Sequence, residues 1–249
     1  MAPKRRRTTE AENKPEVKKG SSSRLTKSQS QPLKVKDNKK KKKNNNNSPV
    51  VVFAHGAGAP SSSDWMIRWK NLLSDALHPV EVVTFDYPYI SARKPPPKAE
   101  KLVEFHAGIV KDIANKYPQH PLILVGKSMG SRVSCMVAAE EGIEASAVVC
   151  LGYPLKGTKG AIRDAPLLQL EVPTMFVQGT KDGLCPLASL EMVMKKMKAK
   201  NSLHIVENGD HSFKIAKKNL ESAGITHEEA EQSAVQAIAM FVSQIIGTK

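Results

Sequence analysis

Short apolar runs alternate with longer amphipathic segments from about residue 48 to the end of the chain. The apolar runs are rich in Val, Ile, Leu and Phe and predict six strands: residues 50–53, 80–85, 122–125, 147–151, 174–177 and 203–206. Runs that are apolar throughout are typical of strands buried on both faces, as in a mostly parallel sheet.

Between these runs, apolar residues recur at the spacing of a helix. The pattern predicts helices near residues 64–77, 99–117, 129–141 and 187–197, and a last one that begins at Thr226-x-x-Glu229, a capping-box pattern. Strands that alternate with helices predict an α/β fold: a doubly wound, mostly parallel sheet of about six strands with helices on both faces.

Charge divides the chain unevenly. The first 49 residues hold sixteen lysines and arginines against four acidic residues, whereas residues 50–249 hold 22 against 20. The early segment has no aromatic residue and few aliphatic ones, so it cannot bury enough apolar surface to offset its chain entropy. We therefore expect a disordered basic tail over residues 1–48 and one folded domain over residues 49–249.

Two basic clusters in this tail, residues 3–7 and 39–43, resemble nuclear import signals. The alternative is a solvated basic segment that carries no import signal. The first interpretation predicts a protein of the nucleus, the cytoplasm or both, with an import receptor or a nuclear complex as a partner of the tail.

The composition of the rest argues against several classes. A near-neutral domain predicts no specific nucleic-acid groove, and no apolar run approaches the roughly 18–20 residues of a membrane span. Nor does an apolar stretch follow the N-terminal basic residues, as in a secretory signal. The three cysteines lack metal-site spacing, so we expect free thiols in a reducing compartment, with Cys185 as packing, and no metal.

The candidate nucleophile is Ser128, in Gly126-x-Ser128-x-Gly130 directly after a predicted strand and before a predicted helix. A serine on such a sharp turn takes a strained backbone conformation, and side chains two residues away would crowd it. In this strand–turn–helix context the motif indicates a nucleophile elbow. A small residue in a tight turn is the alternative.

Two further residues follow predicted strands in the order that suits this serine. Asp182 follows the fifth strand and His211 the sixth, and the order Ser, Asp, His is that of an α/β-hydrolase triad. His211 is expected to exchange the proton of Ser128, and Asp182 to orient the imidazole. Ordinary turn chemistry can also explain Asp182, and His211 can instead cap a strand end. Asp86 and Asp210 are weaker candidates for the acid.

The segment His55-Gly56-Ala57-Gly58 follows the first strand, where an oxyanion loop is expected. The backbone N–H groups of Ala57 and Met129 are the predicted donors. His55 is a candidate for substrate contact, although a structural role in the loop is the commoner one. Further candidates for substrate contact are Tyr89, Arg93 and Lys127. The Lys127 cation, next to the nucleophile, either binds an anionic substrate or faces solvent.

These motifs resemble the α/β-hydrolase superfamily over nearly all of residues 49–246, and within it the dienelactone-hydrolase-like branch. The sequence is also similar to the hydrolase-like group of testis-expressed and NSL-complex regulatory subunit proteins. The strings that carry the resemblance are His55–Gly58, Phe85–Tyr89, Arg93–Pro96, Gly126–Arg132, Gly152–Leu155, Gly179–Asp182 and Asp210–Phe213.

The resemblance implies a serine hydrolase that forms an acyl-enzyme on Ser128 and needs no cofactor. The segment 152–173 is too short to build a lid domain, so we expect an open site that takes a small ester-like substrate. The alternative is a non-catalytic hydrolase-fold subunit of a nuclear, chromatin-associated complex, because some members of this group act in such complexes.

Overall fold

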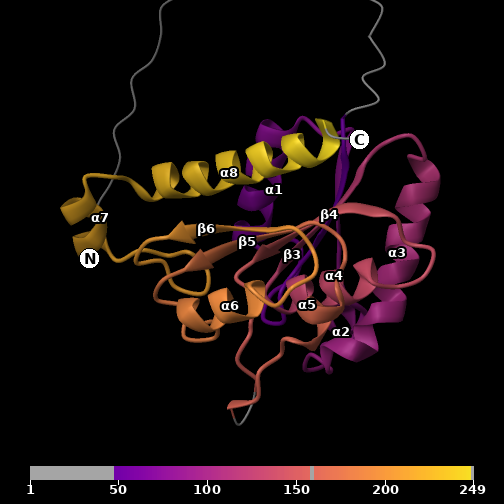
Figure 1. Cartoon of the computed structure of the whole chain (residues 1–249), viewed down its shortest axis with the longest axis horizontal. Coiled ribbons are helices and arrows are strands. Elements are labelled where there is room, and N and C mark those ends of the chain that lie inside the picture. The colour runs from indigo at the N-terminus through magenta and orange to yellow at the C-terminus, as the bar shows by residue number, and fades with distance from the viewer. Residues whose placement is uncertain (1–47, 158–159, 248–249) are drawn as a thin grey trace, which may run out of the picture. The chain divides into compact units, whose positions relative to one another are not determined.

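A six-stranded, fully parallel sheet forms the centre of the structure, a computed structural model that describes residues 48–157 and 160–247 (Figure 1). Its strands are β1 (Val50–Ala54), β2 (Glu81–Phe85), β3 (Leu122–Lys127), β4 (Ala145–Leu151), β5 (Thr174–Gly179) and β6 (Asn201–Val206). They lie in the order β2-β1-β3-β4-β5-β6, and every neighbouring pair is parallel. The predicted sheet is confirmed.

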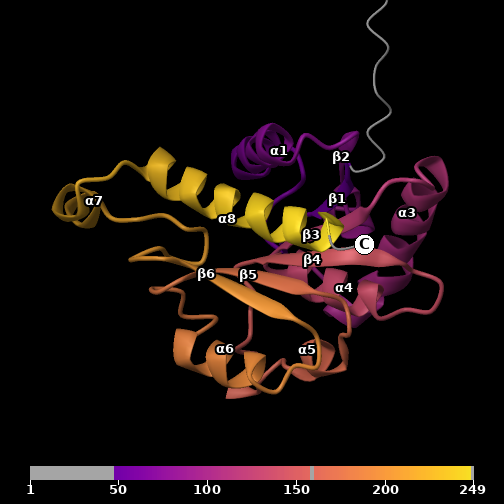
Figure 2. The same ribbon diagram turned by 45° about the horizontal axis from the view of Figure 1, so that its top comes forward.

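Helices cover both faces of this sheet. They are α1 (Asp64–Leu77), α2 (Pro88–Ser91), α3 (Val103–Lys116), α4 (Met129–Ala138), α5 (Ala165–Gln169), α6 (Leu187–Met194), α7 (Lys217–Ala223) and α8 (His227–Gly247), with the 3-10 turn η1 (Ala99–Leu102) before α3. Helices α1 and α8 cover one face, and α3 to α6 cover the other (Figure 2). This doubly wound arrangement is the one that the alternating pattern predicts.

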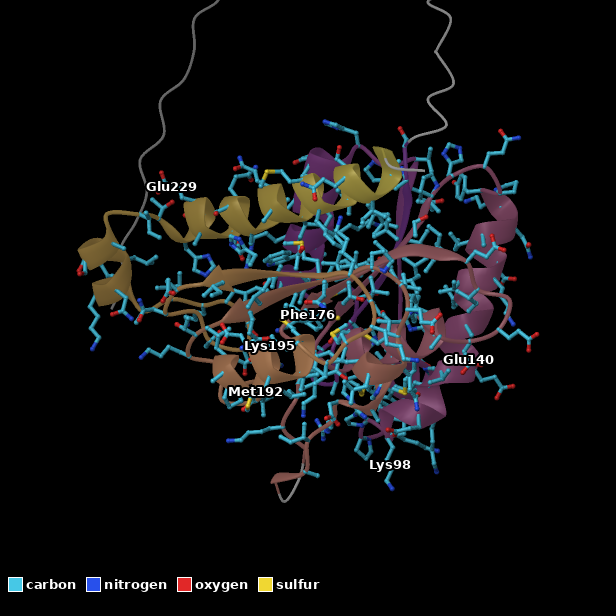
Figure 3. The ribbon with its side chains drawn as sticks, viewed as in Figure 1. Lys98, Glu140, Phe176, Met192, Lys195 and Glu229 are labelled. Atoms are coloured by element: carbon cyan, nitrogen blue, oxygen red, sulfur yellow. The ribbon has the colours of Figure 1, made fainter. Side chains whose placement is uncertain are left out.

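The strands are buried on both sides because their side chains pack alternately into two separate apolar clusters, one on each face of the sheet. In β1, Val50 and Val52 join the cluster under α3 and α4, whereas Val51 and Phe53 join the cluster under α1 and α8. All five residues of β1 are fully buried. Figure 3 shows Phe176 of β5 among the packed side chains of the interior. Continuous apolar runs are therefore what this sheet requires.

The two helices over the second cluster are also joined by a polar contact that the hydrophobic pattern does not reveal. Glu231 of α8 is only 4% exposed, and its carboxylate accepts hydrogen bonds from Arg68 and Trp69 of α1. A buried carboxylate needs such partners, since an unpaired one is costly.

Several element ends differ from the predictions. The predicted helix over residues 99–117 begins with the 3-10 turn η1, and the helix predicted over residues 187–197 ends at Met194. The short helices α2, α5 and α7 were not predicted, because four to seven residues carry too little periodicity. The capping box is confirmed: Glu229 N–H donates to Thr226 Oγ1, and Thr226 N–H donates to Glu229 Oε2.

Two expectations concern the limits of the fold. The predicted tail, apart from residue 48, lies outside the described residues. Within the described part, no helix combines the length and apolar character needed to cross a membrane.

Candidate active site

Ser128 lies between β3 and α4 with a backbone φ of 52° and ψ of −116°, a strained conformation for a residue with a side chain. The two flanking glycines make the turn sterically feasible. A Cβ on Gly130 would lie 2.6 Å from the carbonyl oxygens of Ala54 and His55, and a Cβ on Gly126 would overlap the backbone of Ser131. The turn has the geometry expected of a nucleophile elbow.

The structure brings Ser128, His211 and Asp182 together in one hydrogen-bonded line. Ser128 Oγ lies 2.7 Å from His211 Nε2, and His211 Nδ1 lies 2.7 Å from Asp182 Oδ2. An ionised carboxylate only accepts hydrogen bonds, so Nδ1 carries the proton and Nε2 is left to accept from the serine hydroxyl. This is the tautomer that a general base next to a serine nucleophile needs.

Asp182 is held by three donors. Besides His211, Gln178 Nε2 donates to Oδ2 at 2.7 Å, and Leu184 N–H donates to Oδ1 at 2.8 Å. Burial alone would raise the pKa of this carboxyl, but the hydrogen bonds and the attraction to His211 hold it below its ordinary value. The carboxylate is therefore kept ionised. Sequence reasoning did not select Gln178, which lies within an apolar strand and carries no motif.

The two alternative acids are engaged elsewhere. Asp86 accepts a hydrogen bond from the backbone N–H of Ser61 at 2.6 Å, and 38% of its side chain is exposed. Asp210 Oδ1 accepts from the backbone N–H groups of Ser212 and Lys214. Neither contact places a carboxylate on the His211 ring.

The loop after β1 lies beside the nucleophile, where an oxyanion loop is expected. Gly56 is so close to Ser128 that a Cβ on it would lie 3.3 Å from the serine Cβ. The Tyr89 hydroxyl donates to the carbonyl oxygens of Gly56 and Ala57, at 3.3 and 3.2 Å. Met129 is the first residue of α4, so its N–H has no acceptor within the helix.

His55 is fully buried, and both of its ring nitrogens are engaged within the protein. Tyr87 N–H donates to Nε2 at 3.1 Å, so Nδ1 carries the proton and donates to the carbonyl oxygen of Gly56 at 2.6 Å. Burial lowers the pKa of this imidazole, which favours the neutral ring. Together with Tyr89, which donates to the Gly56 and Ala57 carbonyls, His55 holds the loop in place. This geometry favours the structural role over contact with a substrate.

Lys127 corrects an expectation, since its side chain faces neither solvent nor the cleft. It is 7% exposed, its Nζ donates to the backbone carbonyl of His211, and the ammonium lies 5.1 and 5.2 Å from the ring centres of Trp65 and Phe213. The aromatic pair shields the lysine and attracts its charge. Lys127 thus supports the backbone of the catalytic histidine candidate.

A cleft of about 1070 Å³ opens at the nucleophile. Ser128, Ala57 and Met129 lie in its wall, so the hydroxyl and both predicted oxyanion residues face one space. Arg93 is exposed and is not among the described residues that line this cleft. The other walls come from residues 96–98 before η1, from η1, from α4 and from the loops after β4 and β5, without a separate lid in the described part of the chain.

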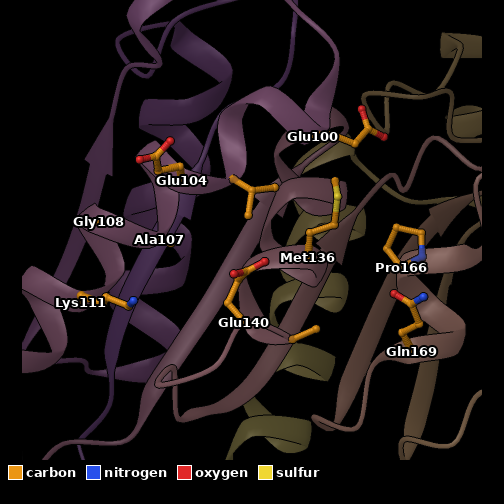
Figure 4. Close-up of a pocket in the computed structure, with 11 residues that line it drawn as sticks. Glu100, Glu104, Ala107, Gly108, Lys111, Met136, Glu140, Pro166 and Gln169 are labelled. Carbon is orange, nitrogen blue, oxygen red and sulfur yellow. The ribbon is translucent and has the colours of Figure 1, made fainter.

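A second pocket, of about 710 Å³, lies between α3, α4 and α5 (Figure 4). Glu100, Glu104 and Glu140 give it an acidic lining, with Lys111 as a counter-charge. The lining of this pocket does not include Ser128.

Across the described ranges 48–157 and 160–247, no three His, Cys, Asp or Glu side chains are grouped as metal ligands.

Comparison with known proteins agrees with this fold. The sequence profile of a family described as an alpha/beta hydrolase domain matches residues 47–243. Among solved structures, the chain is similar to the dienelactone hydrolase from Anabaena variabilis ATCC 29413, with a TM-score of 0.59 and 20% identity over 82% of this chain and 88% of that one.

Two other solved structures have the same fold. The alpha-beta serine hydrolase homologue from Coxiella burnetii is 13% identical with a TM-score of 0.58, over 76% of this chain and 84% of that one. Est1E from Butyrivibrio proteoclasticus is 17% identical with a TM-score of 0.56, over 80% and 90% of the two chains. At such identities the likeness concerns the fold alone.

Proposed function

The chain belongs to the alpha/beta hydrolase domain family, and from this premise we propose that it is a serine hydrolase that cleaves small esters through Ser128, His211 and Asp182. The observation that carries the proposal is the unbroken line of hydrogen bonds from the serine hydroxyl through the imidazole to a buried carboxylate. The similarity of fold to the dienelactone hydrolase from Anabaena variabilis supports it.

In the proposed reaction, Ser128 Oγ attacks the ester carbonyl carbon while His211 Nε2 takes the hydroxyl proton. The backbone N–H groups of Ala57 and Met129 stabilise the negative oxygen of the tetrahedral intermediate, where losing one donor typically costs about 3 kcal/mol. Asp182 stabilises the imidazolium. His211 then gives its proton to the departing alcohol, which leaves the acyl group on the serine.

Hydrolysis of the acyl-enzyme uses the same groups in reverse. His211 takes a proton from a water molecule, the resulting hydroxide attacks the acyl carbon, and the carboxylic acid leaves as the proton returns to Ser128 Oγ. Each turnover consumes one ester and one water and releases one alcohol and one acid. No cofactor takes part in this proposal.

The open cleft favours short substrates. Its walls combine prolines and alanines with charged side chains, rather than a long apolar channel. We therefore infer small ester-like molecules in preference to long-chain lipids. Similarity to the testis-expressed and NSL-complex group, a role of the tail in nuclear import and a nuclear partner stay predictions.

Labelling with a fluorophosphonate probe tests the proposal, because only an activated serine reacts with it. The wild-type protein should be labelled and should hydrolyse 4-nitrophenyl acetate, and Ser128→Ala should lose both properties while keeping its unfolding midpoint. Ser131→Ala is the matched control: this neighbouring hydroxyl donates to the Ser128 carbonyl and should not be needed for labelling. An unlabelled but folded wild-type protein would favour the non-catalytic alternative.

A further inference from the structure

The turn that carries His211 follows β6, and Asp210 closes it from within. Asp210 Oδ1 accepts hydrogen bonds from the backbone N–H groups of Ser212 and Lys214, at 2.7 and 2.9 Å. Phe213 has a φ of 64°, a left-handed conformation that is strained for a residue with a large side chain. A strained turn keeps its shape only where the surrounding structure holds it.

Side chains from two other elements hold successive carbonyl groups of this turn. Lys127, at the end of β3, donates to the His211 carbonyl. The indole Nε1–H of Trp65, near the start of α1, donates to the Ser212 carbonyl at 3.1 Å. Trp65 and Ser212 are 147 residues apart in the chain, and no motif of the sequence marks this contact.

The ring of Trp65 also acts on the other donor. The Lys127 ammonium lies 5.1 Å from the ring centre of Trp65 and 5.2 Å from that of Phe213. A cation over an aromatic face is attracted to it, and Trp is the strongest such partner. Trp65 therefore reaches the turn twice, through its N–H on Ser212 and through the lysine that it keeps on the His211 carbonyl.

A neighbouring tryptophan makes a useful contrast. Trp69 lies one turn further along α1 and stacks on Trp65, with the ring centres 5.1 Å apart and 18° between the ring planes. Both rings belong to the apolar packing under α1 and α8. The fully buried Trp69, however, donates its Nε1–H to Glu231 of α8, whereas Trp65 donates to the turn of His211. The two indoles share their packing and differ in what their N–H groups hold.

The position of the His211 ring is sensitive to such support. Its two nitrogens each have to stay at hydrogen-bond distance from a different partner, Ser128 Oγ and Asp182 Oδ2, both at 2.7 Å. The side chain is 27% exposed, so its neighbours enclose it only in part and its backbone has to be held. A displacement of about 1 Å in a reacting group can cost on the order of 100-fold in rate.

We propose that Trp65 is a positioning residue for the catalytic histidine: its indole N–H fixes the Ser212 carbonyl, and its ring keeps Lys127 on the His211 carbonyl. The inference rests on the proposed serine-hydrolase function and adds a residue of α1 on which the reaction depends. Trp65 is not among the described residues that line the cleft. Its loss should therefore slow turnover without weakening the binding of substrate.

Two variants of Trp65 test the proposal on 4-nitrophenyl acetate. Trp65→Phe keeps an aromatic ring beside Lys127 and removes the N–H donor, so kcat should fall at least about fivefold while KM stays within about twofold of wild type. Trp65→Leu also removes the ring and should lower kcat further. Unchanged kcat in Trp65→Phe, or a loss that appears in KM alone, would overturn the positioning role.

Trp69→Phe is the matched control, because it makes the same change in the stacked neighbour. It takes one donor from the buried carboxylate of Glu231, so it should lower the unfolding midpoint. Its kcat should stay within about twofold of wild type, since Trp69 donates nothing to the turn of His211. Equal losses of kcat in Trp65→Phe and Trp69→Phe would mean that packing under α1 matters and the Trp65 donor does not.

A proton NMR measurement separates this proposal from the proposed function. The proton that His211 Nδ1 donates to Asp182 Oδ2 should give a resonance far downfield, and it can be followed in folded Ser128→Ala protein without any turnover. Adding Trp65→Phe should shift or broaden this resonance, and adding Trp69→Phe should leave it unchanged.

The outcomes distinguish the two ideas. A resonance that Trp65→Phe leaves unchanged would overturn the positioning role, even if the wild type hydrolyses esters. A resonance that responds to Trp65→Phe, in a protein that hydrolyses no ester and takes no fluorophosphonate label, would overturn the hydrolase assignment and keep the positioning of His211. Absence of the resonance from folded Ser128→Ala protein would overturn both, because His211 would then not be held against Asp182.

Discussion

Replacing Lys127 by Met removes a buried cation while keeping a side chain of similar length. In the wild type, burial lowers the pKa of this lysine to about 8 from its ordinary 10.5, although Asp182 and Asp210 pull it upward. The substitution should therefore change how stability depends on pH, beyond any fixed change in stability at one pH.

The sign follows from the two pKa values. Below about pH 8 the lysine is charged in both the folded and the unfolded chain, so the folded state carries the whole cost of burying the charge. Above pH 8 the folded protein loses the proton first, and the free energy of unfolding rises with pH until the unfolded chain is also neutral near pH 10.5. At 1.36 kcal/mol per pH unit, the wild type should gain about 2.5 kcal/mol between pH 7 and pH 10 that Lys127→Met does not gain.

Urea unfolding of both proteins at pH 7, 8, 9 and 10 measures this difference. Other groups titrate over the same range, but they do so in both proteins and cancel in the comparison. If the free energy of unfolding changes with pH in the same way in both proteins, the reasoning is refuted, because Lys127 then has the same pKa in the folded and the unfolded chain. The variant also leaves the His211 carbonyl without its Lys127 donor, so we expect kcat for 4-nitrophenyl acetate to fall about tenfold, about 1.4 kcal/mol in the barrier.

Four further predictions test other parts of the site and the tail. Asp182→Asn should lower kcat by about 10⁴-fold, the size seen in another serine hydrolase, and a loss below threefold would move the acid role elsewhere. Tyr89→Phe should lower kcat more than it raises KM, because the oxyanion loop loses its tether; unchanged kcat would contradict this. Gly130→Ala should reduce both activity and the unfolding midpoint, since the added carbon meets two carbonyl oxygens; a fully active, stable variant would refute the packing argument. Deleting residues 1–47 should leave activity and the unfolding midpoint unchanged, and should abolish nuclear enrichment of a large fluorescent fusion. Enrichment that persists would show that the tail does not carry the import signal.

The sheet could be predicted because its strands are buried on both faces. Continuous apolar runs such as 50–53 and 174–177 admit few other interpretations when helices separate them. Helix ends were less predictable, since three-residue spacing does not distinguish a 3-10 turn at residue 99 from the start of an α-helix. Nor did the pattern give the order of the strands, which depends on crossover connections between residues far apart in the chain.

The triad residues could be selected because each follows a strand at the same edge of a parallel sheet, and chain order supplied their roles. Their supporting residues could not, because they lie inside apolar strands or beside the nucleophile and no motif marks the contact that each side chain makes. Gln178 is 33 residues before His211 in the chain, yet both donate to one oxygen of Asp182. Lys127 was judged by its neighbour Ser128, although Lys127 ends β3 and Ser128 lies in the sharp turn after it, so the two side chains point in different directions. Its side chain therefore lies under His211, away from the cleft.

Several residues of the site lower the stability of the fold, and this supports the proposed catalytic role. The strained backbone at Ser128 typically costs about 1–3 kcal/mol, and Lys127 and Asp182 are charges withdrawn from water. A domain used only for protein contacts could replace each of them by a small or apolar residue and become more stable. Here Ser128 is strained, Asp182 is hydrogen-bonded to the His211 ring that contacts the Ser128 hydroxyl, and Lys127 holds the His211 backbone. The proposed reaction at that hydroxyl makes use of all of them together.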